Sequence, residues 1–195
     1  MESISIFWFR RDLRLEDNTA LNTALSKGKN VLPLFIFDEE IISELPSDDA
    51  RITFIYDSLF RIDQKLKKNN SSLLCLKGNP IEVWKELLQS HSIKSVYANK
   101  DYEPYARNRD VEIEDLLSGH SVEFLLFKDQ VIHEENEVLK KDGTPYTVFT
   151  PYKNKWLEVY KPNSPTNSIS YKSFFQKNVR DLVPECIESL GLIKK

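Results

Sequence analysis

The part of the chain best equipped for chemistry is a short run of charged side chains near its start. It holds three arginines and three acids within the string Arg10-Arg11-Asp12-Leu13-Arg14-Leu15-Glu16-Asp17. Such side chains can hold a ligand through charge-assisted hydrogen bonds, and they can equally pair with one another or form a solvated turn. The residues themselves leave these interpretations open.

The segments around this run predict the elements that position it. Residues 3–9 form an almost unbroken series of β-branched and aromatic side chains, as in strands buried within parallel sheets. After the charged run, Asp17 or Asn18 can cap a helix, whose apolar residues recur at helical spacing. The charged loop is therefore expected at the carboxyl end of a first strand, where open α/β sheets place their ligands.

Strand-like and helix-like segments alternate along the first two thirds of the chain. The expected strands are residues 3–9, 30–38, 72–76, 95–99 and 122–127. The expected helices after the first are residues 49–68, a helix opened by Asn79 and Pro80, residues 104–117, and a short one at 151–160. Short connections of this kind imply parallel strands joined by right-handed crossovers. The expected fold class is α/β, a Rossmann-like three-layer sandwich around a five-stranded parallel sheet in the order 3-2-1-4-5.

The chain is expected to divide near residue 160. Residues 1–160 are assigned to the α/β domain and residues 161–195 to a linker, because residues 161–168 are rich in proline, asparagine and serine. Residues 151–180 contain six basic residues and one acid, Glu158, which is typical of a mildly basic solvated segment. The last residues offer little that would form a second core.

The glycines exclude two common phosphate-binding motifs. The five glycines lie at 28, 78, 119, 143 and 191, and no two are close. A dinucleotide fingerprint and a Walker loop both need clustered glycines so that the backbone can approach phosphate groups. The turn after the first expected strand instead carries bulky charged residues. The sheet therefore has room for a ligand held by side chains, or for no ligand.

The composition and the small number of cysteine and histidine residues exclude further classes of protein. The chain is 41% hydrophobic and 29% charged with a formal net charge of -3, which argues against nonspecific nucleic-acid binding by this chain alone. Cys75 and Cys186 suggest neither a disulfide framework nor a metal cluster, and the three histidines lack ligand spacing. No apolar run approaches membrane length. A soluble cytoplasmic protein without a metal or a membrane partner is expected.

Several strings, in order along the chain, resemble the photolyase/cryptochrome family. The opening string Phe7-Trp8-Phe9-Arg10-Arg11-Asp12-Leu13-Arg14 is similar to the start of that family's pattern. The further matching segments are residues 33–38, Ala50-Arg51, residues 99–110, residues 129–133 with 143–152, and residues 183–191. The resemblance covers essentially the whole chain.

The resemblance implies the amino-terminal α/β domain of a DNA photolyase, a carbon–carbon lyase. In this family a helical carboxy-terminal domain holds FAD and contacts damaged DNA, and the implied reaction is light-driven reversal of cyclobutane pyrimidine dimers. The chain ends where that domain is expected to begin. The resemblance therefore implies a fragment that is inactive alone, with the FAD-binding domain as its partner in cis.

The resemblance also implies an antenna chromophore in this domain. By analogy with members that bind 8-hydroxy-5-deazaflavin, the polar contacts are Asp12, Arg51 and Asp101, and Phe35, Ile36 and Phe37 form an apolar wall. The residues themselves also allow structural roles: Asp12 can belong to a structural ion-pair network, and Arg51 can be an ordinary residue at the start of a helix. Folate-binding members carry Asn-Glu where this chain has Tyr105-Ala106, so a deazaflavin or flavin antenna is expected rather than folate.

Two other functions and one surface feature complete the expectations. The chain is also compatible with a cryptochrome photoreceptor, and a stand-alone nucleotide-binding module of the universal stress protein type is a third alternative, although it typically needs a glycine-rich loop. Late aromatic residues are expected to pack partly against the helical domain and to form an exposed apolar patch without it. These residues are Tyr146, Phe149, Tyr152 and Trp156.

Overall fold

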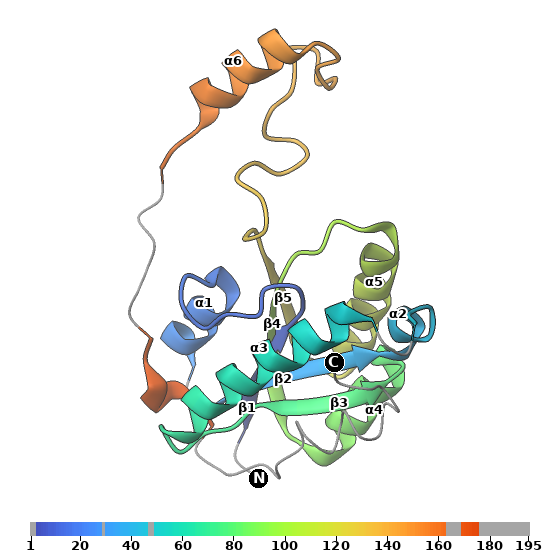
Figure 1. The fold of residues 1–195 in the computed structure, drawn as a ribbon, viewed down its shortest axis with the longest axis vertical. Helices are drawn as coiled ribbons and strands as arrows, with labels where there is room; N and C mark the ends of the chain where they lie inside the picture. Colours follow the sequence, from blue (N-terminus) through green and yellow to red (C-terminus); the bar gives the residue numbers. More distant parts are fainter. Residues whose placement is uncertain (1–2, 29, 47–48, 163–168, 176–195) are drawn as a thin grey trace.

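The chain folds around a five-stranded parallel sheet in the order β3-β2-β1-β4-β5 (Figure 1). A computed structural model describes residues 3–28, 30–46, 49–162 and 169–175. The strands are β1 (Ile4–Phe9), β2 (Val31–Asp38), β3 (Leu74–Gly78), β4 (Ile93–Asn99) and β5 (Glu123–Phe127). The helices are α1 (Thr19–Lys27), α2 (Glu39–Ser43), α3 (Ala50–Lys67), α4 (Pro80–Ser90), α5 (Pro104–Gly119), α6 (Phe149–Val159) and the 3₁₀ turn η1 (Tyr171–Ser173). The predicted α/β class and strand order are confirmed.

The central strand β1 is buried on both faces because helices cover the sheet on both sides. Phe7 and Phe9 pack in one apolar cluster with residues of α1 and α3. Ile6 and Trp8, which point the other way, pack with residues of α4 and α5. The uninterrupted apolar sequence of β1 follows from this two-sided burial, since neither face of the strand meets water.

Side-chain caps begin the helices at the positions that the sequence indicates. Asn18 caps α1 by accepting a hydrogen bond from the Leu21 N–H, whereas Asp17, the other candidate, adopts a left-handed backbone with φ of 51°. Asp49 caps α3 and Asn79 caps α4, with Pro80 at the first helical position. These caps set where each helix leaves the sheet edge.

Several elements differ from the sequence-based expectation; β4 begins two residues earlier and α5 ends two residues later than expected. The short helix α2 was not expected, although Asp38 caps it through a bond from the Glu40 N–H and two acids fill its first turn. Strand β3 continues through Lys77 and Gly78 because both residues pair with the end of β2. Helix α6 begins at Phe149, two residues before the predicted start.

One aromatic residue from the part assigned to a linker lies in the domain core. Phe174 is fully buried in the apolar cluster on the α1 and α3 side, and the Phe175 N–H donates to the Val31 carbonyl over 2.9 Å. The other segments singled out here, residues 163–168 and 183–191 together with Cys186, lie outside the described residues. None of the helices described is both long and apolar enough to span a bilayer.

Candidate functional site

A polar hollow of about 270 Å³ lies where the carboxyl ends of β1 and β4 meet. These strands are neighbours in the sheet, and the chain leaves β1 toward β2 on the opposite side. The position is therefore the topological switch point, at which open α/β sheets bind ligands. Its lining comes from the charged loop after β1, the residues after β4 and the residues after β5, including Arg11, Asp12, Asp101 and Asp129.

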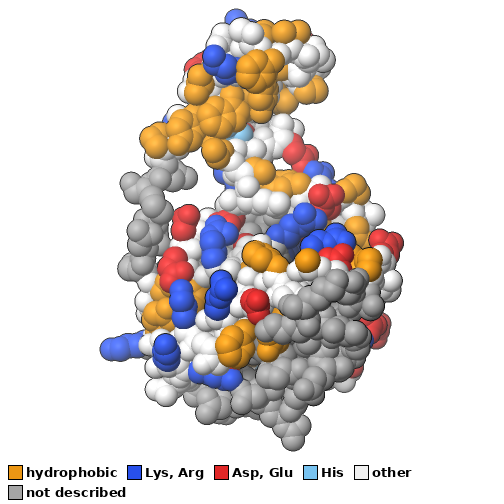
Figure 2. Space-filling view, in the orientation of Figure 1, with side chains coloured by type: hydrophobic (Ala, Val, Ile, Leu, Met, Phe, Trp, Pro, Cys, Tyr) orange, Lys and Arg blue, Asp and Glu red, His pale blue; other side chains and the backbone are white. Residues whose placement is uncertain are grey.

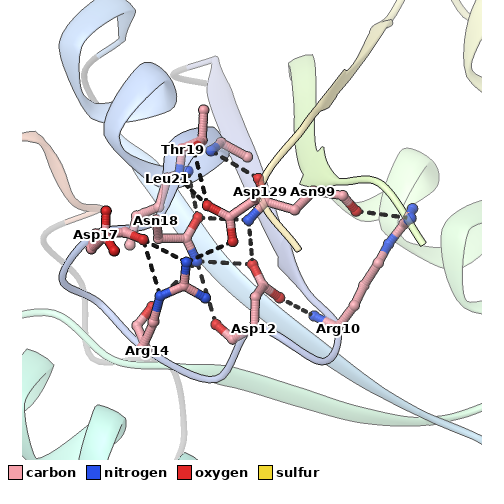
Figure 3. Close-up of polar contacts among 10 residues, drawn as sticks. Arg10, Asp12, Arg14, Asp17, Asn18, Thr19, Leu21, Asn99 and Asp129 are labelled. Carbon is pink, nitrogen blue, oxygen red and sulfur yellow. Dashed lines mark hydrogen bonds and ion pairs between the residues drawn. The ribbon is translucent and has the colours of Figure 1, made fainter. Parts of the chain in front are cut away.

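Asp12 is the centre of a hydrogen-bond network that joins these loops (Figure 3). Its carboxylate accepts from the Arg10 N–H over 2.9 Å, from Asn18 Nδ2 over 2.8 Å and from Asn99 Nδ2 over 2.6 Å. The Asn99 side chain also accepts from the Ala20 N–H, at the start of α1. Asp12 therefore connects β1, β4 and α1, which supports the structural interpretation of this residue.

Asp129 attaches the chain after β5 to the same loop. Its side chain accepts from both the N–H and the hydroxyl of Thr19, over 3.0 and 2.9 Å, and pairs with Arg14 Nη2 at 2.6 Å. Arg14 also donates to the Asp17 carbonyl. Asp129 satisfies an otherwise unpaired N–H in the first turn of α1, and its negative charge there is favoured by the helix dipole.

Arg10 is a buried cation directly behind the hollow. Its side chain is only 6% exposed, pairs with Asp110 over 2.6 Å, and lies above the Trp8 ring at 4.4 Å. Burial lowers the pKa of Arg10, and the nearby Asp110 opposes that change. The guanidinium Nε and Nη2 have no hydrogen-bond partner within the described ranges. Asp110 is therefore the residue that keeps this buried charge compensated.

Tyr105 closes the neighbouring edge between α5 and β2. Its hydroxyl donates to Asp38 Oδ2 over 2.7 Å, and Arg109 lies 3.6 Å from the same carboxylate oxygen. Burial, together with this hydrogen bond, raises the pKa of Tyr105. Tyr105 belongs to the pair compared above with the Asn-Glu of folate-binding members, and its hydroxyl is engaged in this contact.

A second hollow, of about 420 Å³, lies between α5 and residues 134–137. Glu134 accepts from the Tyr102 hydroxyl over 3.1 Å and pairs with Lys100 at 2.9 Å. Burial and the bond to Glu134 raise the pKa of Tyr102 to about 12. Most acids of this hollow are paired, as in the contact of Arg107 with Glu135, so they form a structural network.

The six predicted site residues occupy different environments. Asp12 and Asp101 line the same polar hollow, and Asp101 accepts from Arg11 Nε over 3.1 Å. Arg51 lies on the first turn of α3 with 69% of its side chain exposed, and its hydrogen bond to Asp49 lowers the pKa of that carboxyl to about 2. The other three predicted residues are buried strand residues, namely Phe35, Ile36 and Phe37.

The described residues offer a flat aromatic chromophore polar contacts, but they do not form an open apolar slot for its ring. Phe35 and Phe37 pack edge to face at 4.8 Å within the core and are 7% and 2% exposed. Ile36 points to the opposite side of the sheet. Neither hollow described above is lined by these three residues or by Arg51. Because Phe35 and Phe37 are packed within the core, a flat ring can contact them only if the side chains that cover this part of β2 move aside.

Sequence reasoning missed the residues that organise the edge, chiefly Asn99 and Asp129. Asn99 is the last residue of a predicted strand, β4, which lies beside β1. A polar residue at the carboxyl end of that strand is expected to lie at the switch point, so its position could have identified it. Asp129 opens one of the strings that resemble the family, but its contact with Thr19 spans 110 residues, so local spacing could not assign its role. In the part of the chain that is described, no three His, Cys, Asp or Glu side chains gather as metal ligands would.

Fold and site together define a Rossmann-like α/β domain whose switch point is organised by side chains. The family model described as DNA photolyase matches residues 5–169, so the chain belongs to the DNA photolyase family. It is 36% identical over 165 residues to the deoxyribodipyrimidine photo-lyase of Alkalihalophilus pseudofirmus, covering 82% of this chain and 34% of that protein. It is 28% identical to the Synechococcus enzyme of the same name, covering 97% of this chain and 39% of the relative.

Solved structures agree with this relationship. The archaeal photolyase of Sulfolobus tokodaii is similar with a TM-score of 0.73 and 27% identity, over 99% of this chain and 42% of that one. The class III photolyase of Agrobacterium tumefaciens gives 0.76 and 26%, over 96% and 39%. A Synechocystis cryptochrome gives 0.72 at 16% identity, over 90% and 37%, which shows a shared fold. The chain spans about two fifths or less of the length of these relatives.

Proposed function

We propose that this chain serves as the amino-terminal α/β domain of a deoxyribodipyrimidine photolyase, which repairs cyclobutane pyrimidine dimers in DNA with light. The observation that carries the proposal is the family match over residues 5–169, together with 36% identity to a photolyase that extends well beyond the matched segment. In this proposal, FAD and the contact with damaged DNA belong to a helical domain of the longer protein.

In this proposal the α/β domain has a structural role and takes no part in the chemical step. Bound FAD supplies the light-driven electron transfer, and no residue of this chain is assigned to it. The Asp12 network and the Asp129 contact hold together the loops at the carboxyl edge of the sheet. A rigid edge of this kind is what a chromophore needs for energy transfer, because transfer depends on a fixed distance and orientation.

The direct test is a binding and repair assay on the purified chain. We expect the chain to bind no FAD and to repair no thymine dimers under blue light, while the complete A. pseudofirmus relative, assayed in parallel, does both. Repair by the 195-residue chain alone would show that the chemistry lies within it and would overturn the proposal.

A cryptochrome photoreceptor is the second candidate. It is favoured by 27% identity to chicken Cryptochrome-2 over 85% of this chain, and by the fold shared with the Synechocystis protein. The photolyase proposal is better supported because the relative with 36% identity and the relative that covers 97% of this chain both carry the name deoxyribodipyrimidine photo-lyase. A repair assay on a full-length protein that contains this chain separates the two, since a photoreceptor leaves dimers intact.

We further propose an antenna of the 8-hydroxy-5-deazaflavin or flavin type at the carboxyl edge, held by Asp12, Arg51 and Asp101 against Phe35 and Phe37. Ile36, the third residue of the expected wall, faces the other side of the sheet and is left out of this contact. Support comes from the shared hollow of Asp12 and Asp101 and from the exposed guanidinium of Arg51. This type is proposed rather than folate because the chain has Tyr105-Ala106 where, by the family resemblance, folate-binding members carry Asn-Glu. The S. tokodaii structure is described as holding two FAD molecules, with a novel light-harvesting cofactor implied for that protein.

A further inference from the structure

The Asn99 side chain is buried at the carboxyl end of β4, and each of its polar groups has a partner. The residue is only 4% exposed. Its Oδ1 accepts from the Ala20 N–H over 3.0 Å, and its Nδ2 donates to Asp12 Oδ2 over 2.6 Å and to Asn18 Oδ1 over 2.9 Å. A flip of this amide would place donor against donor at Ala20 and oxygen against oxygen at Asp12. The amide is therefore held in one orientation.

The Asn99 amide decides which oxygen of Asp12 stays open to a ligand. Asp12 Oδ2 accepts from both Asn18 and Asn99, so its two lone pairs are in use. Oδ1 accepts from the Arg10 N–H over 2.9 Å, and the described part of the chain offers it no second donor. Oδ1 therefore keeps one acceptor position free. Asp12 is partly buried and lines the polar hollow at the switch point, so a donor on a ligand in that hollow can fill the position.

Asp12 is also the acid of this hollow that has no cation of its own. Over the middle of the molecule, Figure 2 shows Lys and Arg side chains lying next to Asp and Glu side chains. The cations that line the hollow each pair with another acid, in the pairs Arg10–Asp110, Arg11–Asp101, Arg14–Asp129 and Lys100–Glu134. Asp12 forms no ion pair with any residue that the structure describes. Its negative charge is held by neutral donors alone, which favours a further N–H or O–H donor from a ligand.

We propose that Asn99 is a positioning residue of the antenna site, which acts through Asp12 by keeping Oδ1 of that carboxylate available to a hydrogen-bond donor on the ring of the chromophore. This inference rests on the antenna proposed above and adds a residue whose own polar atoms are all engaged within the protein. Asn99 also accepts from Arg10 Nη1 through its carbonyl oxygen, over 3.2 Å, so its backbone is fixed as well as its side chain. The Asp12 carboxylate is thereby oriented before a ligand arrives.

A purely structural role of Asn99 is the competing interpretation, and the substitution Asn99→Asp distinguishes the two. It keeps an oxygen for the Ala20 N–H and replaces the amide donor by a carboxyl group that faces Asp12. Two carboxyl groups this close share one proton at low pH and repel each other once that proton is lost. At low pH the introduced O–H therefore donates to Asp12 as the amide does, and at high pH the Asp12 carboxylate loses its orientation.

The test measures the dissociation constants of 8-hydroxy-5-deazaflavin and, separately, of FMN for the chain between about pH 5 and pH 8.5. Each variant is divided by the wild-type value at the same pH, which removes any titration of the chromophore. We expect Asn99→Asp to bind within about threefold of the wild type at low pH and at least about tenfold more weakly at high pH. The control Asn79→Asp makes the same change at an exposed helix cap that accepts hydrogen bonds, and its ratio should stay near one.

The dissociation constant of the folded chain separates positioning from a structural role. Circular dichroism selects conditions in which each variant is folded, and a merely structural role would lower the unfolding temperature there without changing this constant. If Asn99→Asp does not stay folded at high pH, Asn99→Ser removes the donor without adding a charge and should weaken binding about tenfold at every pH.

The outcomes also separate this inference from the antenna on which it rests. Chromophore uptake by the wild type, with a ratio for folded Asn99→Asp that does not change with pH, overturns the role of Asn99 alone. Wild-type affinity of Asn99→Ser does the same. No uptake of either chromophore by the wild-type chain at any pH overturns the antenna proposal and this inference with it.

Discussion

Asn99, the last residue of β4, donates from its side-chain amide to Asp12 Oδ2 over 2.6 Å and so joins two loops that lie 87 residues apart in the chain. The same amide group also contacts Asn18, the cap of α1. One carboxylate thereby ties together the two central strands and the first helix (Figure 3). The edge of the sheet depends on this contact for its shape.

Replacing Asp12 with alanine is expected to lower the free energy of unfolding by about 2–4 kcal/mol, because three hydrogen-bond donors lose their acceptor at a partly buried site. Urea denaturation followed by circular dichroism measures this change. Glu16→Gln is the control in the same loop, since Glu16 is half exposed and pairs with the exposed Lys65, and it should change stability by less than about 0.5 kcal/mol. Equal effects of the two substitutions would show that Asp12 is an ordinary loop residue.

Replacing Asp110 with alanine should be more costly, about 3–5 kcal/mol, because it leaves the buried Arg10 guanidinium without its counter-charge. Glu103→Ala provides the comparison. Glu103 lies 3.7 Å from Arg11, both side chains are more than half exposed, and the loss should stay within about 0.5 kcal/mol. Thermal and urea unfolding of the two variants test the contrast. A small effect of Asp110→Ala would mean that water compensates Arg10.

The raised pKa of Tyr102 predicts that the folded protein loses stability at alkaline pH. Its pKa is raised from 10.0 to about 12 in the folded protein, so the folded state holds the phenolic proton more tightly than the unfolded state does. The resulting stabilisation is complete below pH 10 and is lost as the pH rises from 10 through about 12. Tyr102→Phe should make the decline in unfolding free energy over this range shallower, as followed by urea denaturation at a series of pH values. A slope that does not respond to Tyr102→Phe contradicts the assignment.

Arg51 provides the residue-level test of the antenna proposal. Adding 8-hydroxy-5-deazaflavin to the chain should shift the absorption band of the chromophore to the red and quench its fluorescence. Arg51→Ala should weaken retention of the chromophore about tenfold or more, which is the equivalent of one charge-assisted contact. Arg61→Ala, at an exposed position of the same helix, should retain the chromophore normally. Uptake of folate by the wild-type chain, or equal retention by both variants, counts against the site.

Phe174 tests where the folded domain ends. Phe174→Ala should lower the free energy of unfolding by about 3–5 kcal/mol, because the side chain is fully buried in the core. A chain truncated after Tyr160 should lose at least as much. Leu157→Ala, an exposed apolar control, should have an effect within about 0.5 kcal/mol. If the truncated chain is as stable as the full one, the division at residue 160 describes the folded unit correctly.

The sequence by itself determined the class of fold and the limits of most elements. Strands β1 and β2 were predictable because burial on both faces demands an uninterrupted apolar run, and the caps Asn18, Asp49 and Asn79 were predictable because capping is a local interaction. The ordered family strings added the expected cofactor chemistry. All of these signals lie within a few residues of the feature that they predict.

Only the tertiary structure decided how the charged residues are used. Asp12 looks equally suited to a ligand or to a structural network until Asn99 is placed beside it, and Arg10 looks exposed until Asp110 and Trp8 enclose it. Phe174 lies outside the segment with strand and helix patterns and still completes the core. Each of these roles depends on partners distant in the chain, and local spacing carries no information about such pairs because the folded sheet alone brings them together.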